Sequence, residues 1–121
     1  MSYYFKMKII QQGHYEEKKS KFHSYLYSLN TFEEYKGVLE IIKKKHKKAN
    51  HHCFAVIYNN EIKLSNDSEV GSPGRIINDY LAREKLNNHI LIVSRIFGGI
   101  KLGQGGVARA FRKAINNLEN L

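Results

Sequence analysis

Hydrophobic and polar residues first alternate along the chain and then recur at helical spacing. Residues 3–12 and 20–29 show the alternation of half-buried strands, and the polar segment 13–19 separates them. Residues 31–34, Thr-Phe-Glu-Glu, match a capping box, in which two side chains satisfy the first backbone N–H groups of a helix. A helix to about Lys48 is expected from apolar residues three or four positions apart: Phe32, Tyr35, Leu39 and Ile42.

The second half of the chain shows the same two periods. Residues 52–58 and 61–64 predict a hairpin around Asn59-Asn60, because asparagine tolerates the left-handed conformation of tight turns. Ser72-Pro73 is an N-cap followed by proline at the first helical position, which predicts a second helix. Residues 89–97 are mostly apolar, as expected of an interior strand covered on both faces. A last helix from about Val107 is predicted by the apolar stripe Val107, Ala110, Phe111, Ala114, Ile115 and Leu118.

These elements predict an α+β fold. Their order, β-β-α-β-β-α-β-α, indicates a mixed sheet of four to five strands with three helices mainly on one face. The chain has 121 residues and one proline, and it contains no Ser/Gly-rich spacer. We therefore expect residues 1–121 to form a single domain without a linker.

Composition narrows the function classes. The 20 basic residues exceed the 11 acidic ones, giving a net charge of +9, and such an excess attracts polyanions such as nucleic acid or an acidic protein surface. The single cysteine, Cys53, excludes an intrachain disulfide and fits a reducing cytoplasm. Apolar runs such as residues 90–93 are too short to span a bilayer. We expect a cytoplasmic protein without a membrane partner.

A glycine cluster between residues 98 and 106 is the most informative local feature, because glycine at this density implies a backbone need. The cluster precedes a predicted helix start, whose free N–H groups and positive dipole end bind anions. Neither a P-loop nor a G-x-G-x-x-G dinucleotide motif is present. An anion site and a tight strand-to-helix connection both remain open. The candidate anion-binding residues are Arg95, Gly98, Gly99, Lys101, Gly103, Gly105, Gly106, Arg109 and Arg112.

Other groups of reactive side chains support weaker hypotheses. Asp67 and Glu69 form a candidate acidic pair, although such a segment is also typical of a polar turn. Only His51 and Cys53 would share a strand face in the run 51–53, and no second cysteine is available, so we predict no metal site and no cofactor. The basic run 43–48 is typical of a solvated helix end. No complete catalytic constellation is visible, so catalytic residues stay unassigned and an enzyme is disfavoured.

Four motifs, in order, resemble the N-terminal domain of the Impact/YigZ family. Residues 95–111, R-I-F-G-G-I-K-L-G-Q-G-G-V-A-R-A-F, closely follow the family's R-Y-F-G-G-I-K-L-G-x-G-G-L-x-R-A-Y. Residues 20–22 match its S-K-F, and residues 49–53 match its A-x-H-H-C. Residues 66–74 correspond to its D-D-G-E-P-x-G-T-A-G but lack the Glu-Pro pair and are one residue shorter. The resemblance covers about residues 10–118.

The resemblance implies a fold like the second domain of ribosomal protein S5. It also implies a link to translation, because eukaryotic relatives resemble regulators of translation. Longer relatives carry a second, ferredoxin-like domain that we do not expect in this chain. Because the motifs that carry them occur together, Asp67 and Glu69 are expected beside Arg95 and Lys101 in one polar cleft.

Two functions follow from these observations. The first is a non-enzymatic binding domain for RNA, the ribosome or a translation-associated protein. Lys101, Arg109, Arg112 and Lys113 would make its contacts, since the last three share one helix face. The alternative is an enzyme or binding protein for a phosphorylated or other anionic small molecule, with Asp67 or Glu69 as acid or base.

Overall fold

Strands and helices alternate along residues 8–121, which are the part of the chain that the computed structural model describes. The elements are β1 (Lys8–Glu17), β2 (Ser20–Ser28), α1 (Glu34–Lys45), β3 (His51–Tyr58), β4 (Glu61–Ser65), α2 (Pro73–Arg83), β5 (His89–Ile96), α3 (Gly103–Asn116) and β6 (Glu119–Asn120). Within this described part, no helix is both long enough and apolar enough to cross a membrane.

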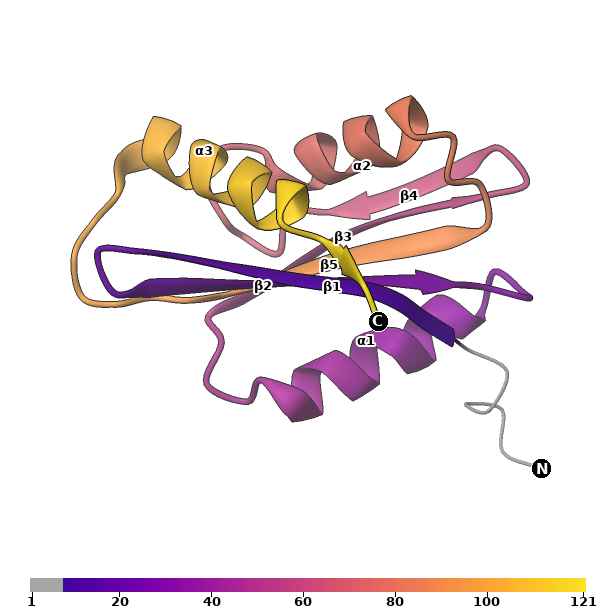
Figure 1. Cartoon of the computed structure of the whole chain (residues 1–121), viewed down its shortest axis with the longest axis horizontal. Helices are drawn as coiled ribbons and strands as arrows, with labels where there is room; N and C mark the ends of the chain where they lie inside the picture. Colours follow the sequence, from indigo (N-terminus) through magenta and orange to yellow (C-terminus); the bar gives the residue numbers. More distant parts are fainter. Residues whose placement is uncertain (1–7) are drawn as a thin grey trace.

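All strands join one sheet in the order β4-β3-β5-β2-β1-β6, and every neighbouring pair is antiparallel. The predicted α+β class with three helices is confirmed, with α2 and α3 on one side of the sheet and α1 on the other (Figure 1). The sheet differs from the expected mixed sheet of four to five strands. β2 and β3 run the same way, but β5 lies between them and opposes both. The sixth strand, β6, has two residues and leaves no periodic pattern in the sequence.

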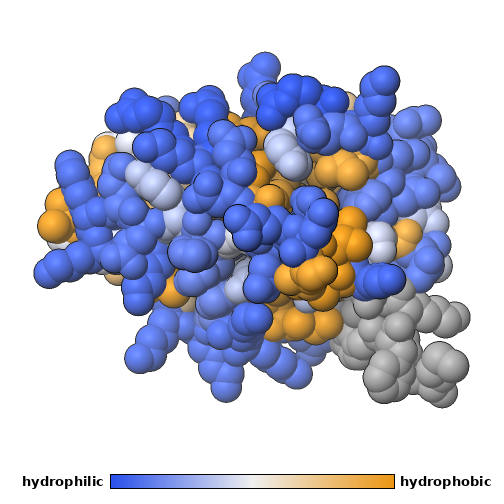
Figure 2. Space-filling view, viewed as in Figure 1, coloured by the Kyte–Doolittle hydropathy of each residue, from blue (hydrophilic) through white to orange (hydrophobic). Residues whose placement is uncertain are grey.

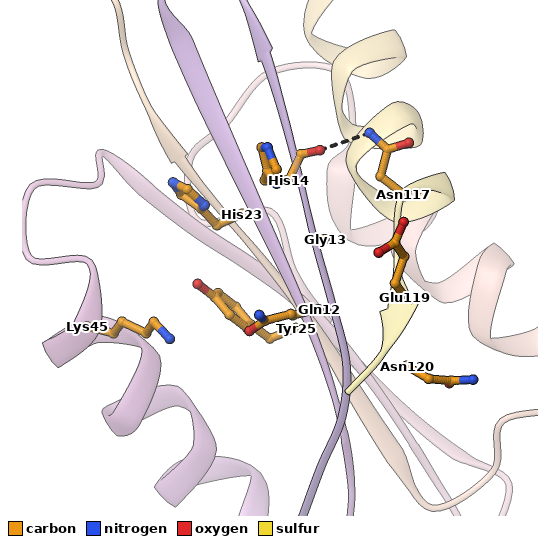
Figure 3. A pocket seen from close by; sticks show the side chains of 9 residues that line it. All are labelled: Gln12, Gly13, His14, His23, Tyr25, Lys45, Asn117, Glu119 and Asn120. Carbon is orange, nitrogen blue, oxygen red and sulfur yellow. Dashed lines mark hydrogen bonds between the residues drawn. The ribbon is translucent and has the colours of Figure 1, made fainter.

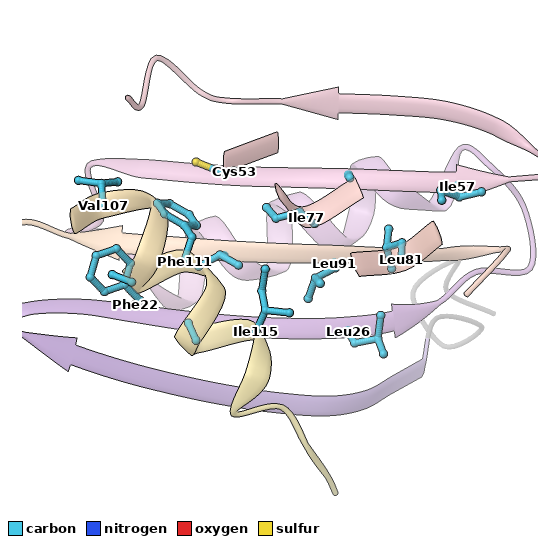
Figure 4. Packing of buried hydrophobic residues seen from close by; sticks show 14 residues of the cluster. Phe22, Leu26, Cys53, Ile57, Ile77, Leu81, Leu91, Val107, Phe111 and Ile115 are labelled. Carbon is cyan, nitrogen blue, oxygen red and sulfur yellow. The ribbon is translucent and has the colours of Figure 1, made fainter. Parts of the chain in front are cut away.

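Two hydrophobic cores lie on the two faces of the sheet. Alternate residues of each strand point to opposite faces, so β2 sends Phe22 and Leu26 toward α2 and α3 but Tyr25 toward α1. The first core includes an edge-to-face contact between Phe22 and Phe111, with ring centroids 5.4 Å apart (Figure 4). In β5, residues 90–95 are buried in succession, which confirms the predicted interior strand.

The outer surface in the view of Figure 2 is mostly hydrophilic, with apolar side chains in separate patches. Polar residues also form the tight turns between neighbouring strands. Asn59 and Asn60 have φ of 48° and 65°, the left-handed pair that a tight hairpin needs, as predicted. Lys18 and Lys19 make an equivalent turn with φ of 47° and 67°. β1 therefore continues to Glu17, and the expected polar connection 13–19 is mostly strand. Part of the predicted first strand, residues 3–7, lies outside the described residues.

Helix starts follow the sequence signals only in part. α2 begins at Pro73 after Ser72, as predicted, but the Ser72 side chain makes no capping hydrogen bond. α1 begins at Glu34, two residues later than the capping box indicated. Half of that box is present, because a carboxylate oxygen of Glu34 accepts the N–H of Asn30 at 2.6 Å and of Thr31 at 3.2 Å. This buried glutamate thereby fixes the approach of the chain to α1.

Candidate functional site

The glycine segment ends in the first turn of α3, which contains Gly103, Gly105 and Gly106. The prediction that it makes a turn before a helix starting near Val107 was wrong, since the helix begins four residues earlier at Gly103. Gly103 has φ of 73° and nothing stands within 4 Å of where its Cβ would lie. The backbone conformation, and not crowding, therefore requires glycine there. Glycine has a helix propensity about 1 kcal/mol worse than alanine, so the sequence placed the helix start after the glycines.

The N-terminal end of α3 is open and positively charged. Its N-cap residue, Leu102, makes no side-chain capping bond, and the first turn carries no acidic residue. Gly103 and Gly105 are exposed. A guanidinium nitrogen of Arg109 lies 3.3 Å from the place that a Cβ at Gly105 would occupy, so this glycine makes room for the arginine. A cation thus adds to the positive end of the helix dipole without a neutralising carboxylate in the turn.

A cleft of about 500 Å³ adjoins this end of the helix, and we call it the Arg95 cleft. It is lined by residues from β3, the 66–74 loop, β5 and the start of α3, among them His51, Glu69, Val70, Arg95, Phe97, Lys101 and Gln104. The structure therefore brings Glu69, Arg95 and Lys101 into one cleft, as expected from the occurrence of their motifs together.

A buried ion pair forms the polar floor of the Arg95 cleft. Arg95 Nη1 donates to Glu69 Oε2 at 2.9 Å, and the two side chains are only 8% and 3% exposed. His51 Nε2 lies 3.6 Å from the same oxygen, and Glu69 Oε1 accepts the N–H of Val70 at 2.9 Å. Arg95 Nε is buried without a hydrogen-bond partner among residues 8–121. The guanidinium also stacks near Phe22 and Phe97, at 5.6 and 5.7 Å from their ring centroids.

Asp67 does not join this cleft, which corrects the expectation that it would face Arg95 and Lys101. Its Oδ2 accepts the backbone N–H of His52 at 2.6 Å, and its carbonyl oxygen lies 2.8 Å from His51 Nδ1. The residue has φ of 48°, so the backbone turns sharply at this point of the loop. Asp67 therefore ties the loop to the start of β3, while Glu69 faces the cleft.

The remaining predicted site residues have different positions. Gly98 packs against the backbone of Lys19 and Ser20 in the β1–β2 turn, where a Cβ would collide, so its role is packing. Gly99 has φ of 93° in the loop before α3. Gly106 is buried under Leu102, whose Cβ would lie 3.1 Å from a Cβ at that position.

Arg109, Arg112 and Lys113 are exposed along the outer face of α3. The ammonium group of Lys113 stands 5.1 Å from the ring centroid of Tyr15. None of the ion pairs among the described residues involves these three cations or Lys101. The three cations are thus exposed, as their spacing predicts, but Arg112 lines a hollow with Asp79 of α2 whereas Lys113 lies beside Tyr15 of β1.

Sequence reasoning missed several residues of the cleft, among them His51, Val70, Phe97 and Asn50. Asn50 Oδ1 accepts the N–H of Phe97 at 2.8 Å, which holds the loop after β5 against the start of β3. The A-x-H-H-C resemblance marked this segment without indicating its contacts. Val70 and Phe97 are 50% and 44% exposed, so the cleft has an apolar wall beside its polar floor.

Cys53 has a structural role in this region. Burial, followed by the charges of Glu69 and Asp67, raises the pKa of the Cys53 thiol far above its usual range. The thiol therefore stays protonated and donates to the carbonyl oxygen of Asn66 at 3.2 Å. No group of three histidine, cysteine or acidic residues within residues 8–121 is placed to hold a metal ion.

Comparison with known proteins identifies relatives over most of the chain. Residues 18–118 match the family described as Impact N-terminal domain. The IMPACT family member YvyE of Bacillus subtilis is 33% identical over 117 residues, covering 93% of this chain and 54% of the relative. The IMPACT family member YigZ of Escherichia coli is 30% identical over 107 residues, covering 84% and 52%.

The fold also matches a solved structure. A crystal structure of a hypothetical protein superposes with a TM-score of 0.77 at 26% identity, over 96% of this chain and 63% of that one. The chain spans about half the length of the curated relatives that it matches.

Proposed function

The chain belongs to the Impact N-terminal domain family, and we propose that, as a member, it is a non-enzymatic binding domain that contacts RNA of the translation apparatus through α3. The link to translation rests on the family resemblance to ribosomal protein S5 and to regulators of translation. The choice of RNA rests on the net charge of +9 and on where the positive charges lie.

One observation carries this proposal: cations gather at an open helix N-terminus whose first turn has no acidic residue, and they form no ion pair among residues 8–121. Lys101 and the Arg109 guanidinium flank the uncapped first turn. Arg112 and Lys113 continue the positive charge along the helix, which spans about 15 Å from Gly103 to Lys113 at about 1.5 Å per residue. A phosphate at the first turn and further phosphates along α3 would relieve this mutual repulsion.

The test is a fluorescence-anisotropy titration of a short single-stranded RNA at several salt concentrations. We expect affinity to fall steeply with salt. Arg109→Ala/Arg112→Ala should reduce the log–log slope by about 1.4, because each phosphate that the protein neutralises contributes about 0.7. The matched control is Lys36→Ala/Lys44→Ala, which removes the same charge from α1 on the other side of the sheet (Figure 1). Equal effects of the two double variants would contradict binding through α3.

The Arg95 cleft favours a second candidate, a binding site for a small anion with an apolar body. The supporting observation is the buried Arg95 Nε, which has no partner among residues 8–121 and lies beside an apolar wall. Both Glu69 oxygens already accept hydrogen bonds, so Glu69 is better suited to holding Arg95 than to acid–base chemistry.

Nuclear magnetic resonance with phenyl phosphate, an anion with an apolar ring, as the probe tests this candidate. Binding should shift the amide signals of Gly103, Gln104 and Gly105, and Lys101→Gln should weaken it while Lys48→Gln should not. Shifts that avoid the cleft, or that ignore Lys101→Gln, would refute the cleft as an anion site.

A further inference from the structure

Four histidines meet on the α1 side of the sheet, opposite the surface discussed above. The strand register places His14 of β1 opposite His23 of β2, His23 opposite Ser94 of β5, and Ser94 opposite His52 of β3. Three of the histidines, with Ser94 between His23 and His52, therefore form a row across the sheet. His46, which follows α1, stacks on His23 with ring centroids 4.4 Å apart and planes within 9°.

Hydrogen bonds hold two of the imidazoles in place. His46 Nε2 lies 2.6 Å from the Tyr25 hydroxyl, and His52 Nδ1 lies 2.7 Å from Ser94 Oγ. The His23 ring makes no comparable side-chain bond among residues 8–121; it stacks on His46, and its centroid lies 6.5 Å from that of His14. His23 and the exposed His14 are the members of the row that line the neighbouring hollow.

That hollow, which we call the histidine pocket, has a volume of about 700 Å³ and lies between α1 and β6. Figure 3 shows His14, His23, Gln12 and Tyr25 on neighbouring strands, with Lys45 approaching from α1. The Lys45 ammonium stands 5.2 Å from the Tyr25 ring centroid. Glu119 of β6 lies opposite Gln12 and supplies a carboxylate to the far side.

The charges at the two ends of the histidine pocket differ. Burial and then the charges of His14, Lys21 and Lys45 lower the pKa of His23, so its ring is neutral at pH 7 and offers one N–H donor. Lys45 is close enough to contribute to that shift, and it forms no ion pair among the described residues. One end of the pocket is thus cationic with N–H donors, and the other end offers amides and a carboxylate.

We propose that the histidine pocket binds a nucleotide, with its phosphoryl group between Lys45, His14 and His23. A phosphoryl group carries three acceptor oxygens, so it can accept from one ammonium and two imidazoles at once. The pocket is much larger than a phosphate ion, so it also has room for a sugar or base. Such a group can donate a hydrogen bond to the Glu119 carboxylate, and it can donate to or accept from the Gln12 amide. The nucleotide is either free or the end of a nucleic-acid chain, because both present this chemistry.

Titrations of the 15N-labelled chain at pH 7 test the proposal with four probes: adenosine 5′-monophosphate, adenosine, inorganic phosphate, and a 5′-phosphorylated tetraribonucleotide. We expect the monophosphate to shift the amides of residues 12–14, 23–25 and 45–46, inorganic phosphate to shift the same residues more weakly, and adenosine to shift none. A free nucleotide as the natural ligand predicts that the tetraribonucleotide binds more weakly than the monophosphate. A nucleic-acid end predicts tighter binding at the same residues.

Variants separate this pocket from the RNA surface on α3. Lys45→Gln removes an exposed side chain and should weaken the monophosphate about tenfold or more, because it removes a charge-assisted contact. His23→Gln should weaken it as well. Lys48→Gln, a matched change outside the pocket, should leave it unaltered, and so should Arg109→Ala/Arg112→Ala. Equal weakening by Lys45→Gln and Lys48→Gln, or binding of adenosine as tight as that of the monophosphate, would overturn the proposal.

Discussion

Removing the carboxylate from the Arg95–Glu69 pair should destabilise the domain strongly. In Glu69→Gln the amide can still meet the N–H of Val70, but the Arg95 guanidinium loses its counter-charge in a site where both side chains are at most 8% exposed. Breaking a buried pair by neutralising one partner costs about 3–5 kcal/mol, because a charge is left buried and unpaired. Domains of this size are stabilised by about 5–15 kcal/mol in total, so the loss is a large share.

Thermal and urea unfolding followed by circular dichroism measure this loss. At about 3–5 °C per kcal/mol, the Tm of Glu69→Gln should fall by roughly 10–25 °C. Replacing both residues, as in Arg95→Met/Glu69→Met, should cost clearly less than the sum of the single changes, because no unpaired charge remains. A decrease below about 1 kcal/mol for Glu69→Gln, or additive single and double variants, would refute the idea of a buried and mutually dependent pair.

Three further predictions concern other parts of the chain. Burial, followed by the charges of His23, Lys45 and His52, lowers the pKa of His46 from 6.5 to about 4. Between these pH values the unfolded chain binds a proton at His46 and the folded chain does not, so the free energy of unfolding falls as the pH drops from 6.5 toward 4. The shift corresponds to about 3 kcal/mol, which solvent screening reduces to about 1–2 kcal/mol. His46→Gln should therefore flatten the curve of stability against pH in this range, and a curve parallel to that of the wild type would contradict the prediction. Gly103→Ala should cost about 1–2 kcal/mol because its φ is 73°, whereas an unchanged urea midpoint would show that the helix start relaxes. Cys53 should react with a thiol reagent only at the rate of unfolding, because it is buried and its pKa is raised, and rapid labelling of the native chain would argue against this.

The sequence predicted those elements whose signals are local. The Asn59-Asn60 hairpin rests on two residues that tolerate left-handed backbone, and both have it in the structure. The buried strand β5 has apolar residues on both faces, and this pattern alone indicates two covered faces. Pro73 likewise marks the start of α2 through its fixed φ and missing N–H.

Features set by packing were not accessible from periodicity. β1 extends to Glu17 although residues 13–19 are mostly polar, because one face of this strand is largely open to solvent. α3 begins at Gly103 in spite of the poor helix propensity of glycine. In both places tertiary structure overrides the local pattern.

In the candidate site, too, local sequence signals predicted some features and tertiary structure set the others. The exposure of Arg109, Arg112 and Lys113 on α3 followed from their spacing, whereas the pairing of Glu69 with Arg95 came from a family resemblance and not from spacing. That resemblance also placed Asp67 in the cleft, which was wrong because its carboxylate caps the backbone of His52 instead. The histidine row depends on the register of four strands, which the periodicity of a single strand does not reveal.

The central claim is that RNA binds along α3, starting at its open N-terminal end. A chemical-shift map of the 15N-labelled chain titrated with single-stranded RNA at low salt tests it most directly. We expect the largest shifts at the amides of Gly103, Gln104 and Gly105, with further shifts at Arg109 and Arg112 that disappear at high salt. Shifts confined to α1 and the opposite side of the sheet, or no shifts at low salt, would contradict this claim.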